Sequence, residues 1–154
     1  MLEVLVTLVI VAIALLGTAG LQLYAMRMSQ GGQFRSQAVF LADDIAERME
    51  ANKAGAVAGL YAVTLSSIET TATIDCSNAA CNQTALAQYD LSAWETSLVS
   101  MLPQSTWAIT QDTTGNPSTY TISVNWVDRR SNTTYATAGT GETFSYNATR
   151  TIFN

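Results

Sequence analysis

The sequence predicts an α+β protein in which one long N-terminal α-helix packs on a small antiparallel β-sheet. Three observations support this prediction. The first 26 residues contain a single charge, at Glu3, and residues 33–53 then place apolar side chains on one helical face. After Pro103 the apolar pattern changes to a period of two, which is typical of half-buried strands. The length of 154 residues allows one domain of ordinary size.

Residues 4–26 form an uncharged run of 23 residues, whereas an α-helix needs about 20 to cross the hydrocarbon layer of a membrane. A secretory signal peptide explains the run less well, because no basic residue precedes it and its apolar part is too long. A buried core helix also explains it less well, because the run is apolar on every face. We therefore assign residues 1–30 to a transmembrane helix.

Glu3 and Arg27 stand at the two ends of this helix. Glu3 either lies among the headgroups as a first-turn acid or pairs with a cation, for which an α-amino group is the nearest candidate. Arg27 follows the span, so the positive-inside rule would place the rest of the chain in the cytoplasm. A short basic leader, removed by cleavage, would resolve both features.

The helix is expected to continue beyond the membrane through residues 33–53 as an amphipathic half. One face of this segment is apolar and consists of Phe34, Ala38, Leu41, Ile45 and Met49. Charged residues lie mostly on the other face, where Asp44 and Arg48 have the spacing of a helical ion pair. Gly31 and Gly32 are the weak point, because each glycine costs about 1 kcal/mol relative to alanine inside a helix. We expect a hinge there, as a bend or a local loss of helix.

Residues 54–75 are rich in small residues and are expected to form an irregular connection, with one short strand near residues 63–68. Cys76 and Cys81 follow and are the only cysteines of the chain. Two cysteines without any histidine cannot complete a zinc site. Because the pair follows a membrane anchor, we expect a disulfide and a periplasmic or extracellular location.

Residues 84–102 are expected to form a second, short helix that Pro103 ends. Its apolar residues recur at helical spacing: Leu91, Trp94, Leu98 and Met101 or Leu102. Two N-terminal caps are compatible with the sequence, Asp90 or a capping box of Ser92 and Glu95.

Strands are expected within residues 106–153, at residues 106–112, 120–126 and 143–153. Alternation places Tyr120, Ile122, Val124 and Trp126 on one face of the middle strand. The helix at residues 33–53 is the expected cover of this face. Residues 31–154 would then form one globular domain that contains both helical segments, the cysteine loop and the sheet.

The composition argues against most chemical functions. The chain has 12 acidic residues, 7 basic residues and no histidine, which removes the commonest general base and disfavours binding to phosphate backbones. No phosphate loop, nucleophile elbow, dinucleotide turn or zinc motif occurs in the sequence. Three close acids, Asp43, Asp44 and Glu47, fit a solvated helix face better than a catalytic pair. We expect no enzymatic activity, no cofactor, no metal, no nucleic acid and no small-molecule substrate.

An acid followed at once by a long apolar run resembles the N-terminus of type IV pilins and pseudopilins, here as MLEVLVTLVIVAIALLG. Three later segments are similar to PilV-like minor pilins: FRSQAVFLADDIAERMEANK, ALAQYDLSAWETSLVSMLP and TYTISVNWVDRR. In that family the acid is the fifth residue of a mature chain whose amine is N-methylated after a leader is removed, whereas here it is Glu3.

The resemblance implies a type IV pilin-like fold and a subunit that primes pilus assembly with other minor pilins and the major pilin, at or near the pilus tip. Such a subunit waits in the inner membrane with its domain in the periplasm, and then becomes part of an extracellular pilus that serves motility and adhesion. Glu3 would pair with a neighbour's terminal amine and fix the axial register, because an unpaired buried charge costs several kcal/mol. Two alternatives stay open: a minor pseudopilin of type II secretion, or a membrane-anchored enzyme or sensor of the cell envelope.

Overall fold

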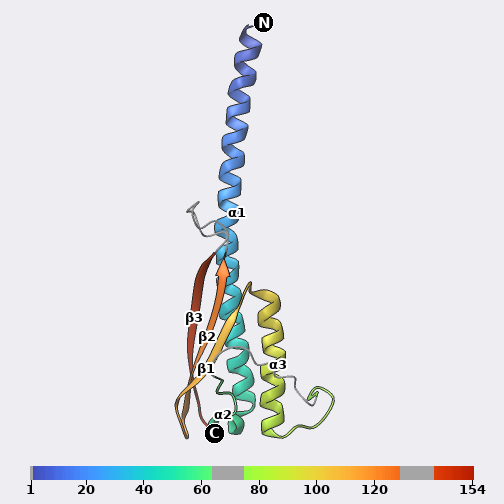
Figure 1. Cartoon of the computed structure of the whole chain (residues 1–154), viewed down its shortest axis with the longest axis vertical. Helices are drawn as coiled ribbons and strands as arrows, with labels where there is room; N and C mark the ends of the chain where they lie inside the picture. The colour runs from blue at the N-terminus through green and yellow to red at the C-terminus, as the bar shows by residue number, and fades with distance from the viewer. Residues whose placement is uncertain (1, 64–74, 129–140) are drawn as a thin grey trace.

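The computed structural model describes residues 2–63, 75–128 and 141–154, and its elements follow one another as three helices and then three strands. The elements are α1 (Leu2–Ala51), α2 (Lys53–Val57), α3 (Gln83–Met101), β1 (Thr106–Thr113), β2 (Ser118–Asp128) and β3 (Glu142–Ile152). Figure 1 shows α1 as a long shaft with the other elements gathered beside its C-terminal half. The predicted fold class, a long N-terminal helix on a small antiparallel sheet, is confirmed.

The helix α1 is continuous over 50 residues, and its two halves have different surroundings. All residues from Leu2 to Ser29 are exposed, whereas the buried residues of the helix all lie in its C-terminal half. Those residues are Ala38, Leu41, Ala42, Ile45, Ala46 and Met49, which matches the predicted apolar face. Phe34, the first residue of that face, is only partly buried.

The continuity of α1 includes Gly31 and Gly32, so the local loss of helix expected at this pair is wrong for the isolated chain. The two glycines lower the helix propensity at this point, but the helix continues for several turns on both sides. Because helix formation is cooperative, the pair stays helical. The role of the pair as a hinge in an assembly stays a prediction.

The three strands form one antiparallel sheet in the order β1-β2-β3. Ile122 in the middle strand pairs with Ile109 of β1 and with Ala148 of β3. Burial alternates along β2, with every even-numbered residue from Ser118 to Asp128 buried. The predicted register, with Ile122 and Trp126 facing the helical layer, is therefore confirmed.

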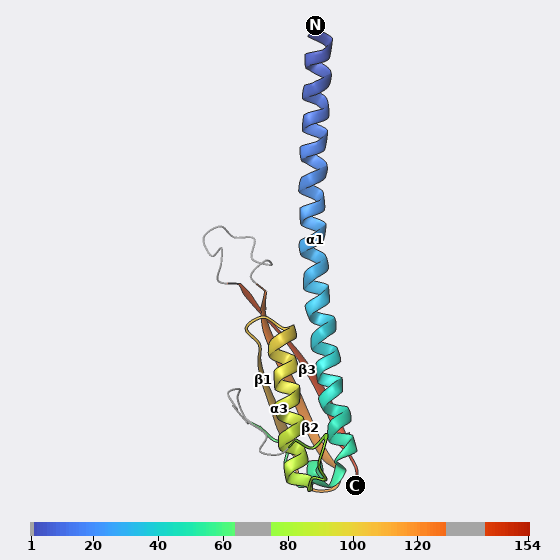
Figure 2. The same cartoon turned by 90° about the vertical axis from the view of Figure 1, so that its right-hand side faces the viewer.

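The sheet has two helical covers instead of the single cover expected from the sequence. In addition to α1, helix α3 contacts the sheet at β1, and it runs beside the C-terminal part of α1 in Figures 1 and 2. Trp94 of α3 meets Trp107 of β1 edge-on, with 5.0 Å between ring centroids, and its indole Nε1 donates a hydrogen bond to the carbonyl of Leu41 in α1. The distance from Nε1 to that oxygen is 2.7 Å. Trp94 of α3 therefore contacts both α1 and the sheet.

The connections test two predicted details, and the first of them needs correction. The helix α3 begins earlier than expected, because Asn82 caps it by accepting a hydrogen bond from the Ala85 amide at 2.9 Å. Asp90 is therefore a mid-helix residue and not the cap. Of the strand expected near residues 63–68, the structure describes only Val63, which forms an antiparallel bridge with Ile109; residues 64–68 lie outside the described residues.

Candidate functional site

The N-terminal half of α1 exposes a large apolar surface with no cover from the rest of the described chain. Its leucine, valine and isoleucine side chains are between 49% and 77% exposed up to Leu23. By length and composition this helix could cross a membrane, with a mean hydropathy of 2.7 over its most apolar 18-residue window. Single exposed apolar side chains are common in soluble proteins, but a continuous exposed run of this size indicates a membrane or protein partner.

Glu3 lies in the first turn of this exposed helix. Within the described residues it makes no hydrogen bond or ion pair, and the residues around it, up to Ser29, are all exposed. Its carboxylate can therefore meet a cation only from outside these residues.

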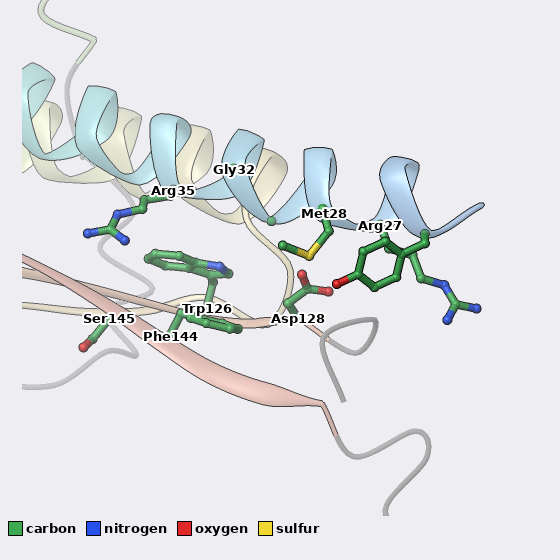
Figure 3. Close-up of a pocket in the computed structure, with 10 residues that line it drawn as sticks. Arg27, Met28, Gly32, Arg35, Trp126, Asp128, Phe144 and Ser145 are labelled. Atoms are coloured by element: carbon green, nitrogen blue, oxygen red, sulfur yellow. The ribbon is translucent and has the colours of Figure 1, made fainter. Parts of the chain in front are cut away.

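A groove opens where α1 leaves the sheet. It has a volume of about 500 Å³ and is lined on one side by residues of α1 and on the other by the ends of β2 and β3. Figure 3 shows Met28 of α1 pointing toward Trp126 and Asp128 of β2. Trp126 in turn stacks on Phe144 of β3, with ring centroids 5.9 Å apart. The floor of the groove is therefore apolar and aromatic.

The missing side chain of Gly31 helps to create this groove. A Cβ atom at Gly31 would lie 3.8 Å from a carboxylate oxygen of Asp128, which is ordinary contact distance, and a Cβ at Gly32 would meet nothing within 4 Å. A larger side chain at Gly31 would enter the groove. Arg27 and Arg35 also line it, so two guanidinium groups and the Asp128 carboxylate give the lining a net charge of +1.

A second cluster of polar groups lies inside the domain, between α1 and α3. Asp90 is only 7% exposed, and its carboxylate accepts a hydrogen bond from the Tyr61 hydroxyl at 2.7 Å. Arg48 approaches the other Asp90 oxygen at 3.4 Å while keeping its pair with Asp44 at 3.1 Å. Asn52 completes the cluster, because its amide donates to the Tyr61 hydroxyl at 3.2 Å and to the Gln83 carbonyl at 2.9 Å. Burial, and then the bond to Asp90, raises the pKa of Tyr61 above its usual range.

The sequence assigned none of these polar residues to a common cluster. A signal was present, since Asp90 occupies the same helical face as Ala87, Leu91 and Trp94. An acid on an apolar stripe indicates a buried charge with a partner on another segment. The cluster joins α1, α3 and the segment at Tyr61 through these hydrogen bonds and the Arg48–Asp90 ion pair, and so fixes the packing of α3 on α1.

The structure joins Cys76 and Cys81, as predicted, with their Cα atoms 5.7 Å apart. The preceding Asp75 shapes the loop, because its carboxylate accepts hydrogen bonds from the Ser77 hydroxyl and the Asn78 amide at 2.7 and 2.8 Å. These bonds lower the pKa of Asp75.

The predicted site residues do not converge on one place. Glu3 is at the free end of the shaft, Gly31 and Gly32 are at the groove, and the disulfide lies just before α3. Asp43 and Glu47 are exposed on α1, in agreement with the solvated face predicted for them. Among the described residues, no group of three acidic or sulfur side chains could hold a metal ion.

A helix that is half exposed and half packed on a three-stranded antiparallel sheet is consistent with the type IV pilin fold. A family model described as Tt1218-like, type IV pilin Tt1218, matches residues 20–92, which are 73 of the 154 residues. The matched part begins in the exposed helix and ends within α3, so it includes the groove-lining half of α1, the disulfide and Asp90. No curated protein and no solved structure matches the chain. The family match supports a pilin role, with membrane anchoring and pilus partners in general.

Proposed function

We propose that this chain is a minor pilin of the PilV-like group, which primes type IV pilus assembly together with other minor pilins and takes a place at or near the pilus tip. The observation that carries the proposal is the exposed apolar half of α1. Such a surface is stable in a membrane before assembly and among the equivalent helices of neighbouring subunits afterwards. The match to a type IV pilin family model over residues 20–92 supports the same role.

The proposed role of Glu3 follows from its isolation on this surface. When apolar helices stack in a filament, a carboxylate near the end of one helix becomes buried and needs a cation. The terminal amine of a neighbouring subunit is the cation within reach of that position. Pairing at one point along otherwise uniform apolar helices would fix their axial register.

We also propose that the chain has no catalytic role. Asp44 and Asp90 are paired with Arg48 within the fold, and Asp43 and Glu47 are exposed on α1. Assembly therefore depends on surfaces and not on a reacting group.

The experiment is complementation of a strain that lacks this chain, with wild type, Glu3→Ala and Asp43→Ala as the matched control. Asp43 is an exposed acid on the same helix, outside the apolar half. We expect Glu3→Ala to be membrane-localised and disulfide-bonded, to recover fewer partner pilins in a pull-down, and to restore fewer surface pili than Asp43→Ala. Normal pilus counts without the chain would contradict the priming role. Normal counts and pull-downs with Glu3→Ala alone would contradict only the register pairing, and recovery of secretion subunits instead of pilins would indicate a pseudopilin.

A further inference from the structure

We infer that the groove between α1 and the ends of β2 and β3 binds the headgroup region of one anionic phospholipid at the membrane surface, before the chain is assembled. This inference rests on the proposed membrane anchoring of α1. Its basis is the position of the groove along the helix, the charge of its rim and the apolar character of its floor.

The groove begins where the apolar run ends. Its lining residues on α1 extend from Tyr24 to Arg35, directly after the uncharged residues 4–26. At 1.5 Å per residue this stretch is roughly 17 Å long, and the headgroup layer on each side of the hydrocarbon is roughly 5–8 Å thick. The first part of the groove, with Tyr24, Arg27 and Met28, therefore lies at headgroup level when residues 4–26 span the membrane.

The charge near the groove has the sign that an anionic headgroup requires. The chain as a whole has a net charge of −5, yet Arg27 and Arg35 are the only charged residues between Glu3 and Asp43. This segment is therefore +2, and the remainder of the chain is −7. Guanidinium groups bind phosphate oxygens with two parallel hydrogen bonds. Asp128 also lines the groove, but it is 5% exposed, whereas Arg27 and Arg35 are both exposed.

The floor of the groove suits the glycerol and upper acyl region of a lipid. Met28, Trp126 and Phe144 supply apolar and aromatic surface, and Gly31 leaves the space open. A volume of about 500 Å³ is within the range of pockets that bind small organic molecules. Aromatic residues such as Tyr24 and Trp126 are also the residues that proteins place at the membrane interface.

A second copy of the chain is the competing occupant, and it fits less well. The helix that a neighbouring copy would insert is its own residues 4–26, which contain no charge. That helix would cover Arg27 and Arg35 without supplying an acceptor, and a covered, unpaired cation is costly. Figure 3 shows the Arg27 and Arg35 guanidinium groups at opposite ends of the groove, so a lipid phosphate would pair with Arg27 at the membrane end while the rest of the headgroup region covers the apolar floor.

The test uses the full chain in mixed vesicles of phosphatidylglycerol and phosphatidylcholine in equal amounts, with bromine on the upper acyl chain of only one of the two lipids. Bromine quenches nearby tryptophan fluorescence. Trp126 is 3% exposed but lines the groove, whereas Trp94 and Trp107 pack against each other between α3 and β1 and do not line it. We expect stronger quenching by brominated phosphatidylglycerol than by brominated phosphatidylcholine. Trp126→Phe should remove this difference.

The arginines are tested by combining Arg27→Gln with Arg35→Gln, and Arg150→Gln is the matched control. Arg150 lies near the far end of β3, where it pairs with Glu50 at 3.5 Å. One arginine near an anionic surface contributes roughly a fivefold preference, so the double variant should lose most of the difference between the two lipids, while the control keeps it.

Each remaining outcome overturns the inference. Equal quenching by the two lipids, an unchanged difference in the double variant, or no quenching of Trp126 because a second copy covers it would each contradict a lipid site. Flotation of the vesicles separates this failure from a failure of the proposed function. A chain that floats with vesicles but shows no preference is anchored without a lipid site, whereas a chain that does not float contradicts the anchoring itself.

Discussion

Replacing Asp90 by alanine should destabilise the domain more than any change of an exposed acid. Asp90 is 7% exposed, and its carboxylate is the acceptor for the Tyr61 hydroxyl at 2.7 Å. Tyr61 is fully buried, so water cannot replace the lost acceptor without entering the core. Arg48 would lose one of its two carboxylate partners and keep Asp44.

The two losses set the size of the effect. A hydrogen bond to a charged group contributes roughly 1.5–3 kcal/mol to stability. The Arg48 contact adds at most about 1 kcal/mol, because the arginine side chain is 31% exposed and stays paired with Asp44. We therefore expect Asp90→Ala to lower the free energy of unfolding by about 2–4 kcal/mol. Asp90→Asn keeps an oxygen for Tyr61 and should cost about half as much.

The assay is urea unfolding of the full chain in detergent, followed by tryptophan fluorescence. Trp94 is one helical turn from Asp90 and is fully buried, so its emission reports the release of α3 from α1. Asp43→Ala is the control, because Asp43 is exposed on α1 and its removal should change stability by less than about 0.5 kcal/mol. If Asp90→Ala costs no more than this control, the cluster does not fix the packing of α3.

Three further predictions concern other parts of the fold. Free-thiol labelling of the native chain should find neither Cys76 nor Cys81, and changing both to serine should cost about 2 kcal/mol at most in an unfolding experiment, because the closed loop is short. Gly31→Ala with Gly32→Ala should raise the helicity and thermal stability of the isolated chain, since α1 is already helical there and each glycine costs about 1 kcal/mol; fewer surface pili with this variant would show that assembly needs a hinge. The free energy of unfolding should fall as the pH rises above 10, because the folded chain keeps the Tyr61 proton that the unfolded chain releases; the slope is at most about 1.4 kcal/mol per pH unit for this group, and Tyr61→Phe should reduce it in urea titrations at pH 9 to 11.

Local patterns alone determined the long helix, the three strands and the disulfide. In a membrane, an uncharged run of 23 residues satisfies its own backbone groups as a helix, and this helix remains exposed because the other described residues offer no second apolar surface of that length to cover it. Alternation in β2 fixed which face is buried, because a shift by one residue would expose Ile122 and Trp126. Each of these properties depends on residues that are close together in sequence.

The tertiary structure alone decided the second helical cover, the buried cluster and the groove. Asp90 has the sequence character of a helix cap, but Arg48 lies 42 residues away and Tyr61 lies 29 residues away, so only the folded chain brings its partners to it. The groove likewise exists only where Gly31 of α1 meets Asp128 at the end of β2. The physical reason is the same for the cluster and for the groove. The cost of burying a charge, and the space left between two elements, depend on groups that are distant in sequence, and composition and periodicity contain no information about those groups.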